Sequence, residues 1–479
     1  MKFRFVKLLI LGYAAIFTAY SCNKDLQIGD YISSVEIVEE HDNPLRVPVE
    51  IVFTKSCYYK LEYWQKGNPS VSGSTSVYKT AGGKETATVM FLYPDTEYEF
   101  RVVVNSGSTS CNSDIYGFTT GSLPIGIPEY TVSGAYPHTE IPGYIFQWQA
   151  TAPGWVSFCD TDGNIVWYEQ LEMAARQVTF DQDTRTIVML LGFKTGQNDP
   201  KFQRWCKKIV VMDLEGNRSV DIDTDEAIIA TPHHEIKRMP DGNIAILHSV
   251  VKKFDLTPVG GKPDTEVYGD GITIVTPDLQ TKVWEWDVFG ELDPVRDEYL
   301  EIMTYNERSG LYPRQIDLVH ANSIGWDGNG NIYFTLNHLN ELWKIDRTTG
   351  KVIYRVGDYG NIYLAEEDHA SGLHAAEPLA ENKVLCLNNG KSGEQSRAMI
   401  YEVNPLAKVA TVTLSVSIPA ELSSYDRSNA MLSRDGSMMF FGSTMGRCNV
   451  FTDLEGNVLK VIKRTGISYR SYYYETVEY

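Results

Sequence analysis

A hairpin that recurs along the chain constrains its fold more than any other feature. Each copy has a turn that opens with an acidic or asparagine residue, followed by a strand-like run, and the copies lie 49 to 68 residues apart, at Asp160, Asp213, Asp278, Asp346, Asn404 and Asp453. This spacing fits four short strands and their loops, which is one blade of a β-propeller. Six units predict an all-β, six-bladed propeller over residues 129–479.

A second series of turns lies inside the same units, at Asp183, Asp241, Asp327, Glu381 and Asp435. Three histidines, His234, His320 and His374, each stand seven positions before a turn of this second series. They should therefore begin the first strand of their units, which in a propeller lines the central channel. Equivalent positions in repeated units lie in equivalent places, so we expect the three imidazoles to converge near the axis.

Convergent imidazoles have several uses. A single histidine could fill a wet channel as a hydrogen-bonded polar residue, but three in register, with Asn322 two positions after one of them, favour a functional site. Three imidazoles and an open fourth position could also hold zinc in a hydrolase or lyase. No carboxylate stands in the matching register, so we expect no metal.

The segment before the repeats predicts a separate domain. Residues 31–120 alternate apolar and polar side chains in runs such as Val47–Phe53, and period two indicates half-buried strands. The stretch around Tyr98 looks like the tyrosine corner of a fibronectin type III or immunoglobulin-like β-sandwich. Residues 121–128 are rich in Gly and Pro and predict a linker.

The first residues predict export and a lipid anchor. Lys2, Arg4 and Lys7 precede an apolar stretch from Leu8 that is too short to span a bilayer and ends in small residues before Cys22. The pattern resembles a bacterial lipoprotein signal over residues 1–21. Cys22 would then carry the lipid, residues 22–30 would form a tether, and the protein would lie in the cell envelope, facing the periplasm or the surface. An ordinary cleaved signal peptide is the alternative.

Composition limits the partners. A formal net charge of −19 and an isoelectric point near 5.0 argue against nucleic acid, whose phosphate backbone attracts basic proteins. Six cysteines beyond Cys22 are widely spaced, so they form neither a disulfide scaffold nor a zinc-knuckle pattern. If any two pair, we expect Cys57 and Cys111, because both lie in the small domain.

Several segments of the repeat region resemble the bacterial arylsulfate sulfotransferases. The segments are His233-His234-Glu-Ile, Asp317-Leu-Val-His320-Ala-Asn322-Ser-Ile, Leu342-Trp-Lys-Ile-Asp346, Gly372-Leu-His374, Asn388-Asn-Gly390 and Ser396–Glu402. The most specific of them are the His-x-Asn-Ser-Ile segment and the Lys-Ile-Asp hairpin. The family is exported and couples an amino-terminal β-sandwich to a six-bladed propeller, so the resemblance covers essentially the whole mature chain.

The resemblance implies a reaction and a set of roles. The family moves a sulfuryl group from a phenolic sulfate ester to a phenol without a nucleotide donor, so no cofactor is expected. His374 matches the nucleophile that becomes sulfated, and His234, His320 and Asn322 match residues that hold the sulfate oxygens or exchange protons with the phenol. A neutral imidazole is a competent nucleophile near neutral pH, and two successive displacements let one site serve donor and acceptor.

The chain departs from the family at one position. Asn337, in Leu336-Asn337-His338, stands where the family has an arginine before a histidine. Loss of a fixed cation that faces three developing negative oxygens costs about a few kcal/mol of transition-state stabilisation. Asn337 and His338 are therefore expected to contact substrate. Either His338 or another cation such as Arg314 or Arg397 compensates, or the substrate or the activity differs.

A non-catalytic function also fits the sequence. A lipid-anchored propeller could bind a ligand or a partner protein, with the sandwich domain as a spacer. Turnover of a chromogenic aryl sulfate separates this class from the transferase, and metal analysis separates a metal-dependent hydrolase or lyase from both.

Overall fold

A computed structural model describes residues 27–192, 206–296 and 316–479 together with Tyr299, apart from residues 40, 107, 108, 225 and 230. The protein is all-β: its regular elements in these ranges are β-strands and short 3-10 turns, and many of the strands lie in four-stranded antiparallel sheets. The expected signal, Cys22 and the cation candidate Arg314 lie outside the described residues. No helix in the described ranges is long and apolar enough to cross a membrane.

The first nine strands form two antiparallel sheets whose facing sides share one apolar core. Strand β2 shows why, since its side chains alternate strictly between buried and half-buried from Val47 to Phe53. Tyr98 makes the expected corner contact, because its hydroxyl accepts a hydrogen bond of 2.9 Å from the backbone N–H of Tyr93. One sheet contains β1 (Ile32–Ile37), β2 (Val47–Phe53) and β6 (Gly83–Val89), and the other contains β3 (Cys57–Gln65), β4 (Asn68–Ser74), β5 (Tyr78–Thr80), β7 (Glu97–Ser106), β8 (Thr109–Asn112) and β9 (Tyr116–Thr119).

Cys57 and Cys111 are both free thiols, which contradicts the expected pairing. They lie on β3 and β8, and β7 runs between these two strands. Two inter-strand spacings of about 4.8 Å each separate the backbones by more than a disulfide spans.

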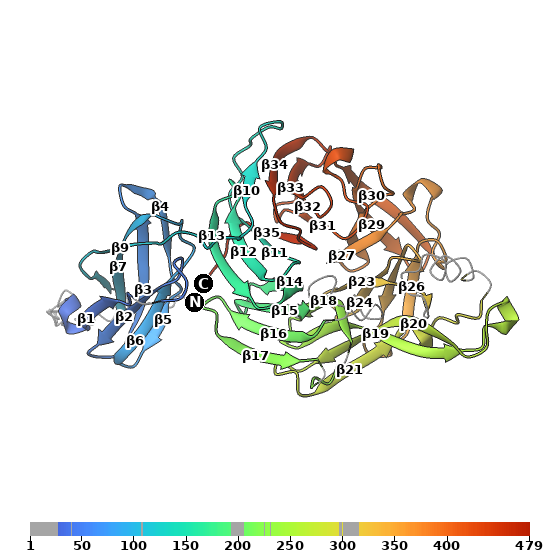
Figure 1. Ribbon diagram of the computed structural model, residues 1–479, viewed down its shortest axis with the longest axis horizontal. Coiled ribbons are helices and arrows are strands. Elements are labelled where there is room, and N and C mark those ends of the chain that lie inside the picture. Colours follow the sequence, from blue (N-terminus) through green and yellow to red (C-terminus); the bar gives the residue numbers. More distant parts are fainter. Residues whose placement is uncertain are drawn as a thin grey trace, which may run out of the picture.

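The remaining strands form six sheets that stand around a common axis (Figure 1). Four of these sheets are built from strands consecutive in sequence. They are β14 to β17 (Ala174–Asp181, Thr186–Gly192, Lys208–Asp213, Arg218–Asp223), β18 to β21 (Pro232–Arg238, Ile244–Phe254, Thr265–Val275, Lys282–Asp287), β23 to β26 (Ala321–Trp326, Ile332–Leu336, Glu341–Ile345, Val352–Val356) and β27 to β30 (Leu373–Ala380, Lys383–Asn388, Arg397–Asn404, Val409–Ser417).

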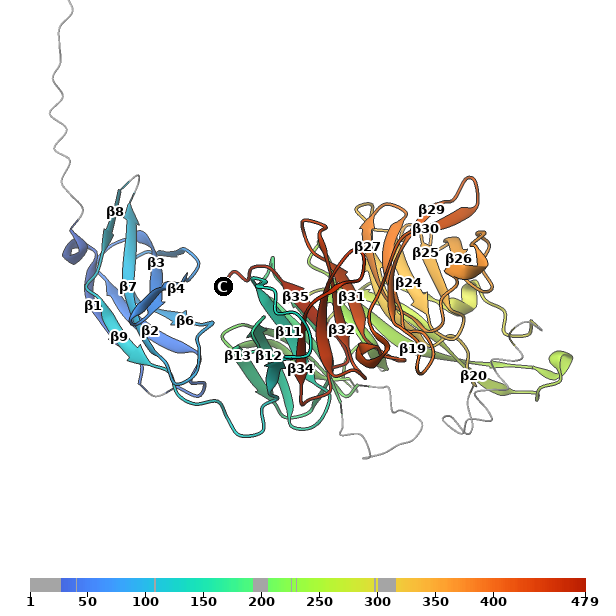
Figure 2. The same cartoon turned by 90° about the horizontal axis from the view of Figure 1, so that it is seen from above.

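The other two sheets close the ring. One contains β31 to β34 (Asn429–Leu432, Met438–Ser443, Cys448–Asp453, Val458–Arg464) and β10 (Tyr130–Val132). The other combines β11 to β13 (Tyr144–Gln149, Gly154–Asp160, Ile165–Leu171) with the last strand, β35 (Ser471–Tyr474), which pairs with β11. The two ends of the repeat region therefore meet in one sheet, beside the smaller domain (Figures 1 and 2).

The innermost strand of each sheet carries the residues nearest the axis. In Figure 1 these strands are β14, β18, β23, β27, β31 and β35, and neighbours along this series contact one another. The turns expected from the sequence fall between strands: the six of the first series join the third strand of each sheet to the fourth, and the five of the second series join the first to the second. The sixth sheet lacks a turn of the second series because its first strand, β35, comes from the other end of the repeat region.

Candidate active site

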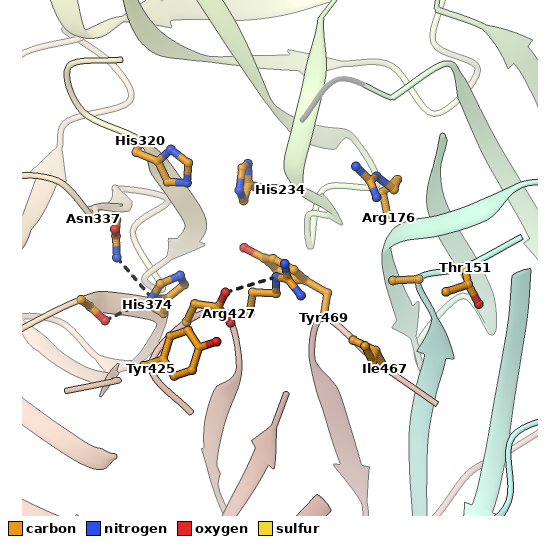
Figure 3. Close-up of a pocket in the computed structure, with 13 residues that line it drawn as sticks. Thr151, Arg176, His234, His320, Asn337, His374, Tyr425, Arg427, Ile467 and Tyr469 are labelled. Carbon is orange, nitrogen blue, oxygen red and sulfur yellow. Dashed lines mark hydrogen bonds and ion pairs between the residues drawn. The ribbon is translucent and has the colours of Figure 1, made fainter. Parts of the chain in front are cut away.

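A pocket of about 550 Å³ opens at the axis, where the inner strands begin. His234, His320 and His374 all line it, so the structure brings together the three histidines singled out by their spacing (Figure 3). They come from three neighbouring sheets, since His234 lies in β18, His320 directly precedes β23 and His374 is the second residue of β27. The rest of the lining is Ala150, Thr151, Arg176, Asn337, Gly372, Tyr425, Asp426, Arg427, Ile467 and Tyr469.

His374 is held as a neutral imidazole. Its Nδ1 lies 3.1 Å from the carbonyl oxygen of Gly372, which can only accept, so Nδ1 carries the proton and Nε2 keeps its lone pair. Burial lowers the pKa of His374 to about 3, with the positive charge of Arg470 acting in the same direction. The ring edge away from Gly372 is turned into the pocket (Figure 3). The site therefore holds an unprotonated ring nitrogen at neutral pH.

His320 has a carboxylate behind it. Its Nδ1 lies 2.7 Å from Oδ2 of the buried Asp317, so Nδ1–H donates to the carboxylate and Nε2 is left for the pocket. His338 stacks on the other side of the ring, with centroids 4.7 Å apart, and its own Nδ1 donates to the carbonyl of Asp317 at 2.9 Å. His338 is not among the described lining residues, and these contacts place it behind His320.

His234 is backed by two buried residues in series. Its Nδ1 lies 2.7 Å from Nδ1 of His233, and Nε2 of His233 lies 3.0 Å from Oδ1 of Asp270. His233 and Asp270 are both fully buried. The second oxygen of Asp270 accepts from the backbone N–H of Ala321 at 2.6 Å. Asp270 thus connects the support of His234 to the residue that follows His320.

β-Bulges aim these side chains into the pocket. The pairing of β18, β23 and β27 with the next strand is interrupted at residues 233–235, 322 and 375–376. His234, His320 and Ala375 have φ angles of 54°, 48° and 53°, in the left-handed region that is costly for residues other than glycine. On three neighbouring sheets this conformational cost therefore falls at or next to a histidine that lines the pocket.

Because of the bulges, the turns after these strands are not in the common register that the sequence predicts. The turn after β18 is closed by a bond between the N–H of Met239 and the carbonyl of Asn243, whereas the turn after β23 runs from Asp327 to Asn331. Asp241 therefore does not occupy the position of Asp327. The common spacing of seven residues places the histidines at one end of their strands, but their positions are not strictly equivalent.

Asn322 does not line the pocket, contrary to its expected contact with substrate. Its side chain is fully buried, where Nδ2 donates to the carbonyl of Leu373 at 2.9 Å and Oδ1 accepts from the hydroxyl of Thr335 at 2.8 Å. Leu373 directly precedes His374. The amide therefore holds β27 against β23 and positions the ring of His374 from behind.

Asn337 does line the pocket, next to His374. Its Nδ2 lies 3.4 Å from Nδ1 of His374 and 3.5 Å from the carbonyl of Leu373. These are long contacts, and Nδ1 already donates to Gly372, so the amide touches the edge of the ring without replacing that bond. Asn337 supplies no positive charge at this position.

Two arginines that the sequence analysis missed bring positive charge to the pocket. Arg176 enters from β14, and Arg427 precedes β31, close to its partner Asp426 at 3.8 Å (Figure 3). The backbone of Arg427 is on the side of His374, because Nδ2 of Asn389 donates to the carbonyl of Arg427 at 3.0 Å. The backbone N–H of Asn389 donates to the carbonyl of Gly372, which also accepts from His374. The spacing rule could have found both: Arg176 stands seven positions before Asp183, and Arg427 eight before Asp435. Arg397, a candidate from the sequence, is not among the lining residues described.

Tyr469 contributes an aromatic wall with a polar tip. Its ring lies edge-on to His234 with centroids 5.7 Å apart, and burial raises the pKa of its hydroxyl to about 12. With Tyr425 and Ile467 it gives the pocket an apolar part suited to a planar ring.

The three pocket histidines, considered above as an alternative zinc site, do not form a group of close potential metal ligands among the described residues. The group whose potential ligand atoms lie within 4.8 Å of one another is Asp317, His320 and His338. The rings of His320 and His338 are stacked at 24°, so their lone pairs lie in nearly parallel planes and do not converge on one nearby point. The hydrogen bonds from both rings to Asp317 account for this cluster without an ion.

A comparison with protein families decides the affiliation. The family model described as Arylsulfotransferase (ASST) matches residues 129–466, which is well over half of the chain and includes all three histidines. The chain belongs to the arylsulfotransferase family. This confirms the resemblance carried by the histidine-containing segments, and it supports a sulfotransferase enzyme.

Other comparisons add little to the family assignment. No curated protein matches the chain. Similar solved structures include a protein of unknown function from Bacteroides caccae (12% identity, TM-score 0.42, covering 69% of this chain and 98% of that one). A virginiamycin B lyase from Staphylococcus aureus is also similar (11% identity, TM-score 0.32, covering 71% and 100%). At TM-scores this low, neither structure indicates a function for this protein.

The burial of neutral His374 predicts a pH dependence of stability that needs no substrate. Its pKa in the folded protein, about 3, is below the usual 6.5, so the unfolded chain binds more protons between these values and stability falls as the pH falls through this window. In urea unfolding, the wild type should lose about 2 kcal/mol relative to His374→Gln between pH 7 and pH 5. An equal pH dependence in both proteins would contradict a buried neutral imidazole.

Proposed function

We propose that this arylsulfotransferase moves a sulfuryl group from a phenolic sulfate ester to a phenol by a ping-pong mechanism through a sulfated His374, without a nucleotide donor. The observation that carries the proposal is the state of His374: a buried imidazole whose Nδ1 is bound to a carbonyl and whose other edge faces a pocket lined by two more histidines. The family implies small aryl sulfates and phenols as substrates.

We also propose a specific fold for each part of the chain. The six sheets formed by β10 to β35 are taken as the blades of a six-bladed propeller, and β1 to β9 as an immunoglobulin-like or fibronectin type III-like sandwich. Support comes from the contacts between successive inner strands and from the pairing of β35 with β11, which joins both ends of the repeat region in one blade. In such a ring the bulged ends of neighbouring inner strands meet at the axis, which is where a substrate must bind to reach all three histidines.

Each half of the reaction exchanges one bond at sulfur. In the first, Nε2 of His374 attacks the sulfur, the bond to the aryl oxygen breaks and the departing phenolate takes a proton. In the second, the acceptor phenol loses a proton, its oxygen attacks the sulfur and neutral His374 leaves. A phenol with a pKa of about 10 needs help with its proton in both directions. His234 and His320, each backed by a carboxylate, are the groups placed to give it.

The sulfuryl oxygens also need stabilisation. Three oxygens share negative charge in the transition state, and fixed donors aimed at such charge lower the barrier. Arg427 lines the pocket and its backbone is on the side of His374, and we infer that its guanidinium supplies the charge that Asn337 lacks.

Steady-state kinetics test the proposed reaction. With p-nitrophenyl sulfate as donor and a phenol as acceptor, the wild type should give ping-pong kinetics, with little turnover when the acceptor is omitted. His374→Ala should abolish transfer because no other group can form the bond to sulfur. His320→Ala should slow transfer by about 10²- to 10⁴-fold, as is usual for the loss of a general acid or base. Full activity of His374→Ala would rule out the mechanism.

A second prediction tests whether Arg427 supplies the positive charge that Asn337 lacks. Arg427→Gln should lower kcat/KM for p-nitrophenyl sulfate by about 10²-fold, as for the loss of one charged donor to a developing oxyanion. Adding Asn337→Arg to this variant should restore part of the rate, while Asn337→Arg alone should change the wild type little. Arg397→Gln, outside the described lining, is the matched control and should keep the wild-type rate. If Asn337→Arg alone raises turnover, the pocket lacks the cation that we assign to Arg427.

We also propose that the protein is a lipoprotein of the bacterial envelope, anchored through Cys22. The charged and apolar start of the sequence supports this. Cys22→Ser should move the protein from the membrane fraction to the soluble fraction after cell lysis, as followed by immunoblotting. A variant that stays with the membrane would place the anchor elsewhere.

A further inference from the structure

We propose that Asp270 and His233 form a proton relay behind His234, so that His234 acts as acid in one half-reaction and as base in the other. This inference rests on the proposed function for its role in turnover, but the relay itself is a property of the folded protein. His234 touches substrate and is the catalytic residue, whereas His233 and Asp270 act through it as positioning residues.

The relay follows from three contacts. Nε2 of His233 lies 3.0 Å from Oδ1 of Asp270, and a carboxylate accepts, so this nitrogen carries a proton. Nδ1 of His233 lies 2.7 Å from Nδ1 of His234, and a contact this short between two ring nitrogens needs a single proton between them. The opposite nitrogen of His234, Nε2, is then the one that can exchange a proton with substrate. Nε2 of His234 is protonated when the shared proton resides on His233, and unprotonated when the shared proton resides on His234.

Two states of the chain differ by one proton. When the shared proton resides on His233, that ring is an imidazolium paired with Asp270, and His234 carries a proton on Nε2 that it can donate. When the shared proton resides on His234, His233 is neutral and Nε2 of His234 is a base. The carboxylate stays ionised throughout, held also by the N–H of Ala321 at 2.6 Å.

The two states match the two halves of the reaction. As the bond between sulfur and the aryl oxygen breaks, Nε2 of His234 gives its proton to the phenolate, while the shared proton moves from His233 to Nδ1 of His234. His234 thereby avoids becoming an anion. When the acceptor phenol attacks the sulfated His374, Nε2 takes the phenol proton and the shared proton returns to His233. Over the full cycle, His234 takes one proton from the acceptor phenol for each proton that it gives to the departing phenolate.

Burial suits His233 and Asp270 to this task. Both are fully buried, so the imidazolium formed on His233 meets its counter-ion in a site without competing water. The pair is held rigidly because His233 lies in β18 and Asp270 in β20 of the same sheet. Among the described residues, the titratable and charged groups around His234 are His233, His320 and Tyr469 in ring contact. Across the pocket are Arg176, His374, Tyr425, Asp426 and Arg427.

Asp270→Asn tests the relay because it keeps the shape and reverses one hydrogen bond. The N–H of Ala321 can only donate, so the oxygen of the new amide must face it and the NH2 group must face His233. His233 then carries its proton on Nδ1 and forces the proton of His234 onto Nε2. His234 can no longer accept a proton from the phenol, since its other nitrogen is occupied by the bond to His233.

The readout is the pH profile of each half-reaction, measured as the burst of p-nitrophenol without acceptor and as transfer to phenol. Asp270→Asn should lower the plateau of both by about 10²- to 10⁴-fold. It should also move the acidic limb of the transfer profile to lower pH, because loss of the negative charge makes the histidine pair less basic. Asp162→Asn, which alters an exposed aspartate paired with His138, is the matched control and should change neither. A slower variant with an unmoved limb would mean that Asp270 is only structural, and would overturn the relay.

A measurement on the resting protein separates the relay from the reaction. In ¹⁵N-histidine NMR spectra of the wild type, one strongly deshielded proton should correlate with the Nδ1 atoms of both His233 and His234, and it should vanish in His233→Gln. Absence of such a proton in the wild type would overturn the relay even if aryl sulfates turn over. If the proton is present but no aryl sulfate is consumed, the proposed function fails and the relay stands.

Discussion

A buried hydrogen-bonded network across the ring axis is the interaction on which the pocket depends. Arg470 donates from Nη1 to Glu235 on β18 and from Nη2 to the carbonyl of Asn322 on β23, both at 2.5 Å. Glu235 also accepts from Gln177 on β14 at 2.6 Å, and Asn322 donates to the residue before His374 on β27. Because a buried charge without partners is very costly, the inner strands must approach closely enough to satisfy Arg470. The same network adjoins the pocket, because Arg470 directly follows Tyr469 of the lining and Asn322 holds the residue before His374.

The three histidines differ in the hydrogen-bond acceptor that lies behind each ring, and this difference suits them to different chemical roles. Nδ1 of His374 faces a neutral carbonyl, which fixes the tautomer. This bond raises the pKa of the ring, but burial lowers the pKa by more and keeps the ring unprotonated. His320 faces the carboxylate of Asp317, and His234 faces a carboxylate through His233. A nucleophile must stay neutral, whereas a group that exchanges protons needs a counter-ion for its charged form. The proposed roles follow this difference.

The sequence alone predicted the hairpins and the meeting of the histidines because both follow from local rules. Aspartates such as Asp160 and Asp453 accept from backbone N–H groups two and four residues ahead, so the turns are encoded in the turn residues themselves. Each of His234, His320 and His374 stands seven positions before a turn residue, and this spacing places all three near the axis. No comparable local pattern shows where a side chain points at a bulge, and for that reason Asn322 and His338 were expected to touch substrate although they lie behind the site.

The sequence also did not predict which charged residues from distant segments would meet in the fold. Asp270 and His233 are 37 positions apart, and Arg470 is 235 positions from Glu235, so only the folded ring relates them. Arg176 and Arg427 stand at nearly the same spacing from their turns as the histidines do, and that spacing could have placed them at the axis. A lone arginine in a sequence is usually a solvated surface charge, whereas a histidine in register points to chemistry.

Sulfation of His374 can be detected by mass spectrometry of protein quenched with p-nitrophenyl sulfate in the absence of acceptor. We expect a gain of about 80 Da, one SO3 group, on the peptide that contains His374, and loss of this label when phenol is added before the quench. Label on a peptide containing His234 or His320 would reverse the proposed roles. Turnover without any label on a histidine would rule out a sulfated histidine as the intermediate.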